Sequence, residues 1–185
     1  MDRVSLLLDA YRERVDRPWR RDLSGPERVW IAVYPPDIER RVRIRRDEFG
    51  VITRDAGRDW RLDDLTKAFE EWLGDHEQRE RYFNRPQFIT PAYAAFGDRV
   101  AETVRGVLTA PDVTEDTVVA LSGVGSLYPM LHVSELVGRV APHIQGRMLI
   151  LFPGSLEHGN YRLLDARDGW NYLAIPITIP EGSTQ

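Results

Sequence analysis

Runs of consecutive apolar residues stand out in a chain where apolar and polar positions otherwise mix. The clearest runs are Val29–Tyr34, Thr117–Leu121 and Met148–Phe152. A run of five or six residues with almost no polar interruption is typical of a strand buried on both faces, as in a parallel sheet. Shorter extended segments are expected at residues 59–62, 161–164 and 172–175.

Between these segments the apolar residues recur every three or four positions, which is the period of an amphipathic helix. Predicted helices cover residues 4–15, 37–49, 65–73, 76–83, 91–108 and 130–144. Asp64 is a typical N-cap, Pro91 a typical first-turn residue and Gly146 a typical stop. The alternation of strands and helices predicts an α/β fold: a three-layer Rossmann-like sandwich, with a mostly parallel sheet of about five strands and helices on both faces.

Length and composition limit the class of protein. The 185 residues fit one domain over residues 1–185, with an N-terminal helix and linker at 1–25 and a flexible tail at 180–185. The absence of cysteine excludes a disulfide scaffold, a thiolate zinc site and a cysteine nucleophile. A net charge of -4 argues against a generic DNA-binding module. No apolar stretch is long enough for a signal peptide or a membrane span, so we expect a cytoplasmic protein.

A glycine loop between a predicted strand and a predicted helix is the sharpest local feature. In an open parallel sheet, ligands bind beyond the carboxyl ends of the strands, where backbone N–H groups can hold a phosphate. The loop is neither a Walker A motif nor Gly-x-Gly-x-x-Gly, because Leu127–Tyr128–Pro129 follow it. A structural turn, an anion site and a partner contact all remain open. The candidate anion-binding residues are Ser122, Gly123, Gly125, Ser126 and Arg147.

A second feature is the segment 161–172, where charged and aromatic residues alternate. Tyrosine, tryptophan and arginine dominate binding hot spots, so this segment is a candidate interaction surface. A loop that is fixed by its own ion pairs, or one with a catalytic role, are the alternatives. The predicted partner-binding residues are Tyr161, Arg162, Asp165, Arg167, Asp168, Trp170 and Asn171.

Other chemistry finds little support in the sequence. His76, His132, His143 and His158 do not pair at metal-ligand spacing. Gly154-Ser155-Leu156 departs from the Gly-x-Ser-x-Gly elbow of serine hydrolases. A metal-dependent nuclease needs clustered carboxylates at strand ends, for which Asp165 and Asp168 are the only candidates. The arginine-rich helix over residues 39–46 is diluted by acidic neighbours and is interpreted as a solvated surface. We therefore predict no catalytic residue, no metal and no cofactor.

Several stretches of the chain together resemble the BrxB family (formerly DUF1788) of bacterial BREX phage-defence systems. The most specific stretch is residues 160–174, supported by residues 119–128 and 146–154. Weaker similarity at 64–66, at Phe69 and Trp72, and at Tyr82–Phe83 extends the resemblance over nearly the whole chain from Arg28.

The resemblance implies a core component of BREX, which methylates host DNA and blocks phage DNA replication. The implied partners are the PglZ-like phosphatase-fold protein and, through it, the adenine methyltransferase. The family has no agreed catalytic residues, so none are carried over to this chain. The expected function is a non-catalytic adaptor or assembly subunit that supports host DNA methylation and phage restriction. The alternative is a degenerate nucleotide- or nucleic-acid-binding α/β domain that uses the Ser122–Ser126 loop.

Overall fold

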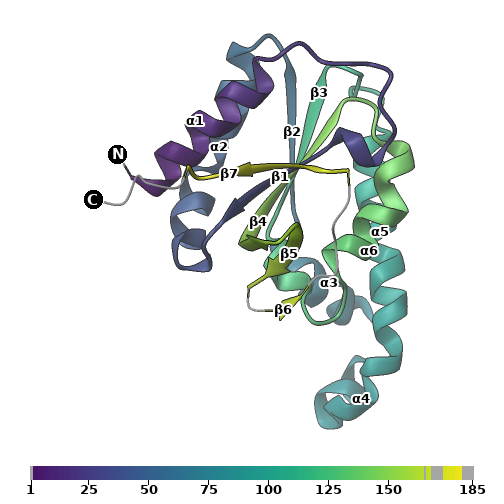
Figure 1. The fold of residues 1–185 in the computed structure, drawn as a ribbon. Helices are drawn as coiled ribbons and strands as arrows, with labels where there is room; N and C mark the ends of the chain where they lie inside the picture. The colour runs from purple at the N-terminus through teal and green to yellow at the C-terminus, as the bar shows by residue number, and fades with distance from the viewer. Residues whose placement is uncertain (1, 165, 168–172, 181–185) are drawn as a thin grey trace.

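The computed structural model describes residues 2–164, 166–167 and 173–180, and Figure 1 shows their arrangement. The strands are β1 (Val29–Tyr34), β2 (Asp59–Asp64), β3 (Thr117–Ser122), β4 (Arg147–Glu157), β5 (Asn160–Leu163), β6 (Ala166–Arg167) and β7 (Ile175–Thr178). The α-helices are α1 (Arg3–Val15), α2 (Glu39–Asp55), α3 (Ala68–Asp75), α4 (Arg79–Asn84), α5 (Tyr93–Leu108) and α6 (Val133–Val140).

The sheet is parallel along its main path, whose order is β2-β3-β4-β1-β7 in the described part of the chain. Beyond Pro153, β4 leaves this parallel sheet and pairs antiparallel with β5, which in turn pairs with β6. Helices cover both faces of the sheet (Figure 1). The predicted fold class, an α/β sandwich with a mostly parallel sheet, is confirmed.

Strand β1 shows why the central strands are apolar without interruption. Side chains alternate between the two faces of a strand. Val29 and Ile31 join the core beneath α5 and α6, whereas Trp30 and Ala32 join the core beneath α1 and α2. Both faces are buried, so every position of the strand must be apolar.

Helices α1 and α2 lie side by side and are joined by a buried hydrogen bond. The Tyr11 hydroxyl oxygen lies 2.6 Å from Thr53 Oγ1. The Thr53 hydroxyl in turn donates to the Phe49 carbonyl oxygen at 2.7 Å. Helix α2 was predicted as a charged surface helix over 37–49. It runs further, to Asp55, because its second half carries the apolar residues that face the sheet.

Two other predicted boundaries were wrong for local reasons. The last strand was predicted over 172–175, of which 172 lies outside the described residues, and it covers Ile175–Thr178. Its Pro176 is tolerated because β7 ends the strand order in the described part of the sheet. The helix predicted over 130–144 is α-helical only over Val133–Val140, and a 3-10 turn that contains Pro142 follows it.

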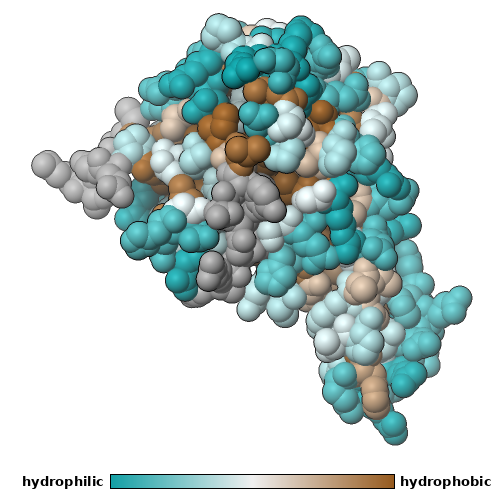
Figure 2. Space-filling model, turned by 45° about the vertical axis from the view of Figure 1, so that its right-hand side comes forward, coloured by the Kyte–Doolittle hydropathy of each residue, from teal (hydrophilic) through white to brown (hydrophobic). Residues whose placement is uncertain are grey.

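An arm, defined here as residues 76–90, projects away from the sheet (Figures 1 and 2). It consists of α4 and a 3-10 turn, η4 (Pro86–Phe88). Within the arm, the ring of Tyr82 packs on that of His76, with centroids 5.1 Å apart. His76 packs in turn on Trp72 of α3, which joins the arm to the body. The rest of α4 is exposed, so the arm presents most of its side chains to solvent.

Candidate functional site

The carboxyl ends of the parallel strands bring the glycine loop, residues 122–126, next to the segment that follows β2. That segment is a 3-10 turn, η3 (Leu65–Lys67), and a second 3-10 turn, η6 (Val124–Leu127), contains most of the loop. Gly123 has a φ of 74°, in the left-handed region. A Cβ atom at Gly123 would lie 2.4 Å from Thr66 Oγ1 and 2.6 Å from the Thr66 backbone nitrogen. The glycine is therefore required by close packing as well as by the turn.

A hydrogen-bonded network surrounds this packed loop. Arg46 Nη1 donates to Asp64 Oδ2 at 2.5 Å and to Ser122 Oγ at 3.3 Å. Asp64 Oδ1 accepts from the Thr66 backbone N–H at 3.1 Å, as expected of an N-cap, and from Thr66 Oγ1 at 2.5 Å. Although burial favours the neutral acid, the hydrogen bonds from Thr66 and Arg46 hold the pKa of Asp64 well below its usual range. The network thus ties α2, β2, η3 and β3 together.

The structure does not bring Arg147 to the glycine loop. Arg147 begins β4 opposite Val118, at the amino ends of the strands, whereas Ser122 ends β3. The basic residue beside the loop is Arg46. Within the loop, the Ser126 backbone N–H already donates to the Gly123 carbonyl oxygen at 3.0 Å. These contacts favour the structural turn, and anion binding by the loop stays a prediction.

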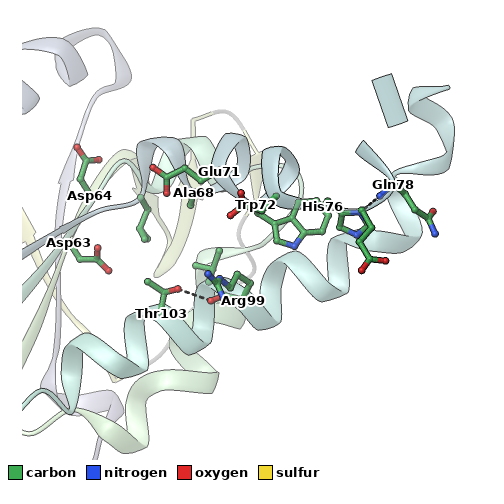
Figure 3. Close-up of a pocket in the computed structure, with 13 residues that line it drawn as sticks. Asp63, Asp64, Ala68, Glu71, Trp72, His76, Gln78, Arg99 and Thr103 are labelled. Carbon is green, nitrogen blue, oxygen red and sulfur yellow. Dashed lines mark hydrogen bonds between the residues drawn. The ribbon is translucent and has the colours of Figure 1, made fainter. Parts of the chain in front are cut away.

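A pocket of about 730 Å³ opens beside the end of β2, between α3 and α5 (Figure 3). Its wall includes carboxylates, one arginine and one aromatic pair. These residues are Asp63, Asp64, Glu71, Asp75, Glu77, Arg99, Trp72 and His76. The rings of Trp72 and His76 pack with their centroids 4.9 Å apart. Asp64 is already paired with Arg46, and Arg99 is the one arginine in the wall beside the other four carboxylates. Acidic groups therefore outnumber basic ones, which suits cationic groups of a ligand or partner.

Asp63 is the most unusual group in this pocket. Its side chain points into the pocket and away from Asp64 (Figure 3). Its Oδ2 atom is buried and has no hydrogen-bond partner among the residues that the structure describes. Burial and the nearby Asp64 carboxylate raise the pKa of Asp63. Among the residues that the structure describes, no three histidine or acidic side chains lie close enough together to hold a metal ion.

Sequence reasoning missed this pocket, because Asp64 was interpreted only as an N-cap. The N-cap role of Asp64 is correct. The available signal was the pair of acidic residues at the carboxyl end of a strand, where α/β sheets place their ligand sites.

The first residues of the predicted partner-binding segment belong to a hairpin that the second half of β4 forms with β5. Tyr161 is only 2% exposed and packs on Phe152, with ring centroids 5.8 Å apart, and burial raises its pKa to about 12. Arg162 is half-exposed and lies 3.3 Å from Glu157, with which it forms an ion pair. Tyr161 therefore anchors the hairpin rather than presenting itself to a partner.

The other predicted contact residues are less fully described. The backbone of Arg167 belongs to β6 and pairs with Arg162. Asp165, Asp168, Trp170 and Asn171 lie outside the described residues.

Comparison with protein families gives a match to the model described as "BREX protein BrxB" over residues 71–177. This chain belongs to the BrxB family. The matched region begins in α3 and ends in β7, so it includes the arm, the glycine loop and the hairpin. It follows that this BREX component is an α/β sandwich with a projecting arm.

Comparisons with curated proteins and with solved structures gave no match. In the described part of this BrxB-family chain, no helix combines the length and apolarity that crossing a bilayer requires.

Proposed function

We propose that the chain is a non-catalytic assembly subunit of a BREX anti-phage complex in the cytoplasm. It supports host DNA methylation and phage restriction by holding other BREX proteins together. Its direct partner is the PglZ-like phosphatase-fold protein, and through that protein it reaches the adenine methyltransferase. Membership of the BrxB family supports the BREX setting of this proposal.

The observation that carries the proposal is the arm. Phe83 is 67% exposed and Phe88 is 40% exposed, although large aromatic side chains gain free energy from burial. The guanidinium carbon of Arg81 lies 4.8 Å from the ring centroid of Phe88. Aromatic residues and arginine are the side chains that contribute most at protein interfaces. Figure 2 shows the arm as a separate lobe, on which a partner can reach more than one side.

The hairpin provides the second part of the proposed docking surface. It extends from the carboxyl end of β4, and the arm follows the carboxyl end of β2 by way of α3. Both elements thus leave the sheet at the edge where α/β proteins place their binding sites. The buried Tyr161 and the ion pair of Arg162 with Glu157 hold the base of the hairpin in a fixed shape.

The polar groups beside the glycine loop favour a structural role over a catalytic one. Asp64 accepts hydrogen bonds from Arg46 and Thr66. These polar groups are therefore already bonded within the protein, where they stabilise the loop. A catalytic group would instead need to be free to bond to a substrate.

Co-purification of the tagged chain with its neighbouring BREX proteins tests the proposal. Phe83→Ser combined with Phe88→Ser removes the exposed aromatic pair, and Arg167→Ala and Trp170→Ala alter the hairpin segment. Ile44→Ser is the matched control, because Ile44 is 71% exposed on α2, which covers the other face of the sheet.

We expect the arm variant and the hairpin variants to recover at least about tenfold less PglZ-like protein than the wild type, the loss expected when an interface hot spot is removed. The control should recover the same amount as the wild type, and all variants should keep their thermal midpoint. Unchanged recovery by the arm and hairpin variants contradicts the docking surface. Turnover of a nucleotide or a phosphodiester by the purified protein contradicts the non-catalytic role.

A further inference from the structure

Arginine side chains gather around Trp19 at the amino ends of the strands, on the edge opposite the glycine loop. The guanidinium carbon of Arg58 lies 4.4 Å from the Trp19 ring centroid, and that of Arg147 lies 4.8 Å from it. Arg147 also lies 5.9 Å from the ring centroid of Trp30. We define the arginine cluster as Arg14, Arg17, Arg20, Arg28, Arg58 and Arg147. These residues come from α1, the linker after it, and the starts of β1, β2 and β4.

Part of this cluster is neutralised by carboxylates. Arg58 forms an ion pair with Asp116. Arg20 forms one with Asp22 at 2.8 Å. Glu27 accepts hydrogen bonds from the backbone N–H and the hydroxyl of Ser24, and its charge also acts on Arg20.

The other cluster members have no carboxylate partner among the described residues. Arg147 donates to the carbonyl oxygens of Gly146 at 2.9 Å and of Arg20 at 2.8 Å. Arg28 likewise donates to backbone carbonyl groups, and Arg14 and Arg17 form no ion pair within the described part of the chain. The cluster therefore holds more positive charge than its neighbours cancel.

Burial makes this uncancelled charge costly. Arg147 is only 5% exposed. Burial, together with the charges of Arg28 and Arg58, lowers the pKa of Arg147 to about 10. A cation that is removed from water and placed beside like charges gains free energy when an anion binds next to it. The fold therefore holds these guanidinium groups in a position that favours an anionic ligand.

Space for such a ligand lies beside the cluster. A pocket of about 290 Å³ is lined by Arg14, Arg17, Arg20 and Arg147. Trp19, Trp30 and one carboxylate, Glu27, also line it, so the arginines outnumber the acidic groups by four to one. A guanidinium group carries a positive charge and can donate two parallel hydrogen bonds to phosphate oxygens, a bidentate geometry that lysine lacks. A small, arginine-lined pocket with aromatic walls suits a phosphate group, either free or attached to a larger molecule.

We propose that the arginine cluster is a phosphate-binding site, distinct from the glycine loop and independent of the assembly role. The ligand is a phosphate group held by Arg14, Arg17 and Arg147. Inorganic phosphate and the phosphodiester of a nucleic acid present this same chemistry, and the experiment below distinguishes them.

The test uses the full chain and two double variants. Arg14→Gln with Arg17→Gln removes two cluster charges without touching the buried Arg147. Arg40→Gln with Arg43→Gln removes the same charge from exposed positions of α2, which form no ion pair in the described part of the chain, and is the matched control. Inorganic phosphate is titrated by thermal shift. Labelled single- and double-stranded 20-nucleotide DNA is titrated by fluorescence anisotropy at two salt concentrations.

We expect saturable binding of at least one probe, weakened about tenfold or more in the cluster variant and about twofold or less in the control. A response to phosphate alone identifies a free-phosphate site. A response to DNA, with a salt dependence that becomes shallower in the cluster variant, identifies a backbone site. The proposal is overturned if the wild type binds none of the probes. It is equally overturned if both double variants weaken binding to the same extent.

Discussion

Asp63 and Asp64 are neighbours in β2, yet their carboxylates lie on opposite faces of the sheet and in opposite electrostatic settings. Asp64 lies on the α2 side and accepts hydrogen bonds from Arg46 and Thr66. Asp63 lies on the side of α5, with a buried oxygen that has no hydrogen-bond partner in the described part of the chain. The two-residue period of a strand alone produces this difference. Their substitutions should therefore change stability in opposite directions.

Asp63→Asn is expected to raise the thermal midpoint at pH 7 by about 1 to 3 °C. Burial and Asp64 raise the pKa of Asp63, so its favourable contribution exists below the unfolded pKa, near 3.9, and is lost as the pH rises through the folded pKa. The gain from the amide should vanish when the midpoint is measured below about pH 4. An unchanged or lower midpoint at pH 7 would show that Asp63 is not destabilising.

Asp64→Asn is expected to lower the free energy of unfolding at pH 7 by about 1 kcal/mol, the scale of a half-exposed charged hydrogen bond. The pKa of Asp64 is depressed, so its contribution is present above the unfolded pKa and is lost as the pH falls through the folded pKa. Urea denaturation of wild type and variant should therefore converge in strongly acidic buffer. Arg46→Gln should reproduce the loss at pH 7, and a loss with Asp64→Asn alone would point to the cap rather than the ion pair.

Gly123→Ala and Gly57→Ala form a matched pair, because both glycines have a φ near 73°. A Cβ at Gly57 meets nothing within 4 Å. The free energy of unfolding of this variant should therefore fall by only about 1 kcal/mol, the cost of the strained backbone. A Cβ at Gly123 meets Thr66, so its variant should lose about 2 kcal/mol more, on the scale of overpacking. Equal losses in chemical denaturation would show that the contact with Thr66 yields easily.

The hydrogen bond between Tyr11 and Thr53 predicts an asymmetric pair of losses. Tyr11→Phe removes a donor, and Thr53 still donates to the Phe49 carbonyl, so we expect a loss of about 1 kcal/mol. Thr53→Val leaves the buried Tyr11 hydroxyl without its partner, so we expect about 2 to 3 kcal/mol. The double variant should lose less than the sum of the two, as measured in a double-mutant cycle. Additive losses would mean that the two hydroxyls do not interact.

The sequence predicted the central strands well and the edge of the sheet less well. Strand β1 has the predicted boundaries, Val29–Tyr34, because burial on both faces leaves an uninterrupted apolar run. Strand β2 was expected to end at Leu62 but continues to Asp64. It is an edge strand, and its last positions serve ion pairs and a pocket rather than the core. Polar residues at such positions carry no strand signal.

The candidate sites were harder to predict, because they depend on contacts between distant segments. The glycine loop was found, but the residue that packs on Gly123 is Thr66, which sequence spacing does not connect to it. The location of Arg147 could have been inferred. Arg147 stands at the start of a parallel strand, whereas Ser122 stands at the end of another. Because parallel strands run in the same direction, the two residues must lie at opposite ends of the strands. Spacing along the chain therefore predicted the helices and strands, whereas the direction of each strand was needed to decide at which end of the sheet a residue lies.

Strand β4 has one further consequence. Its first half is hydrogen-bonded to β1 and β3 in the middle of the sheet, and its second half forms one side of the hairpin. A mechanical load applied to the hairpin therefore passes along a single backbone into the centre of the molecule. The hydrogen bonds to both neighbours are then strained together in shear, instead of being peeled apart one at a time. A protein held by this hairpin can stay folded while the molecules around it move.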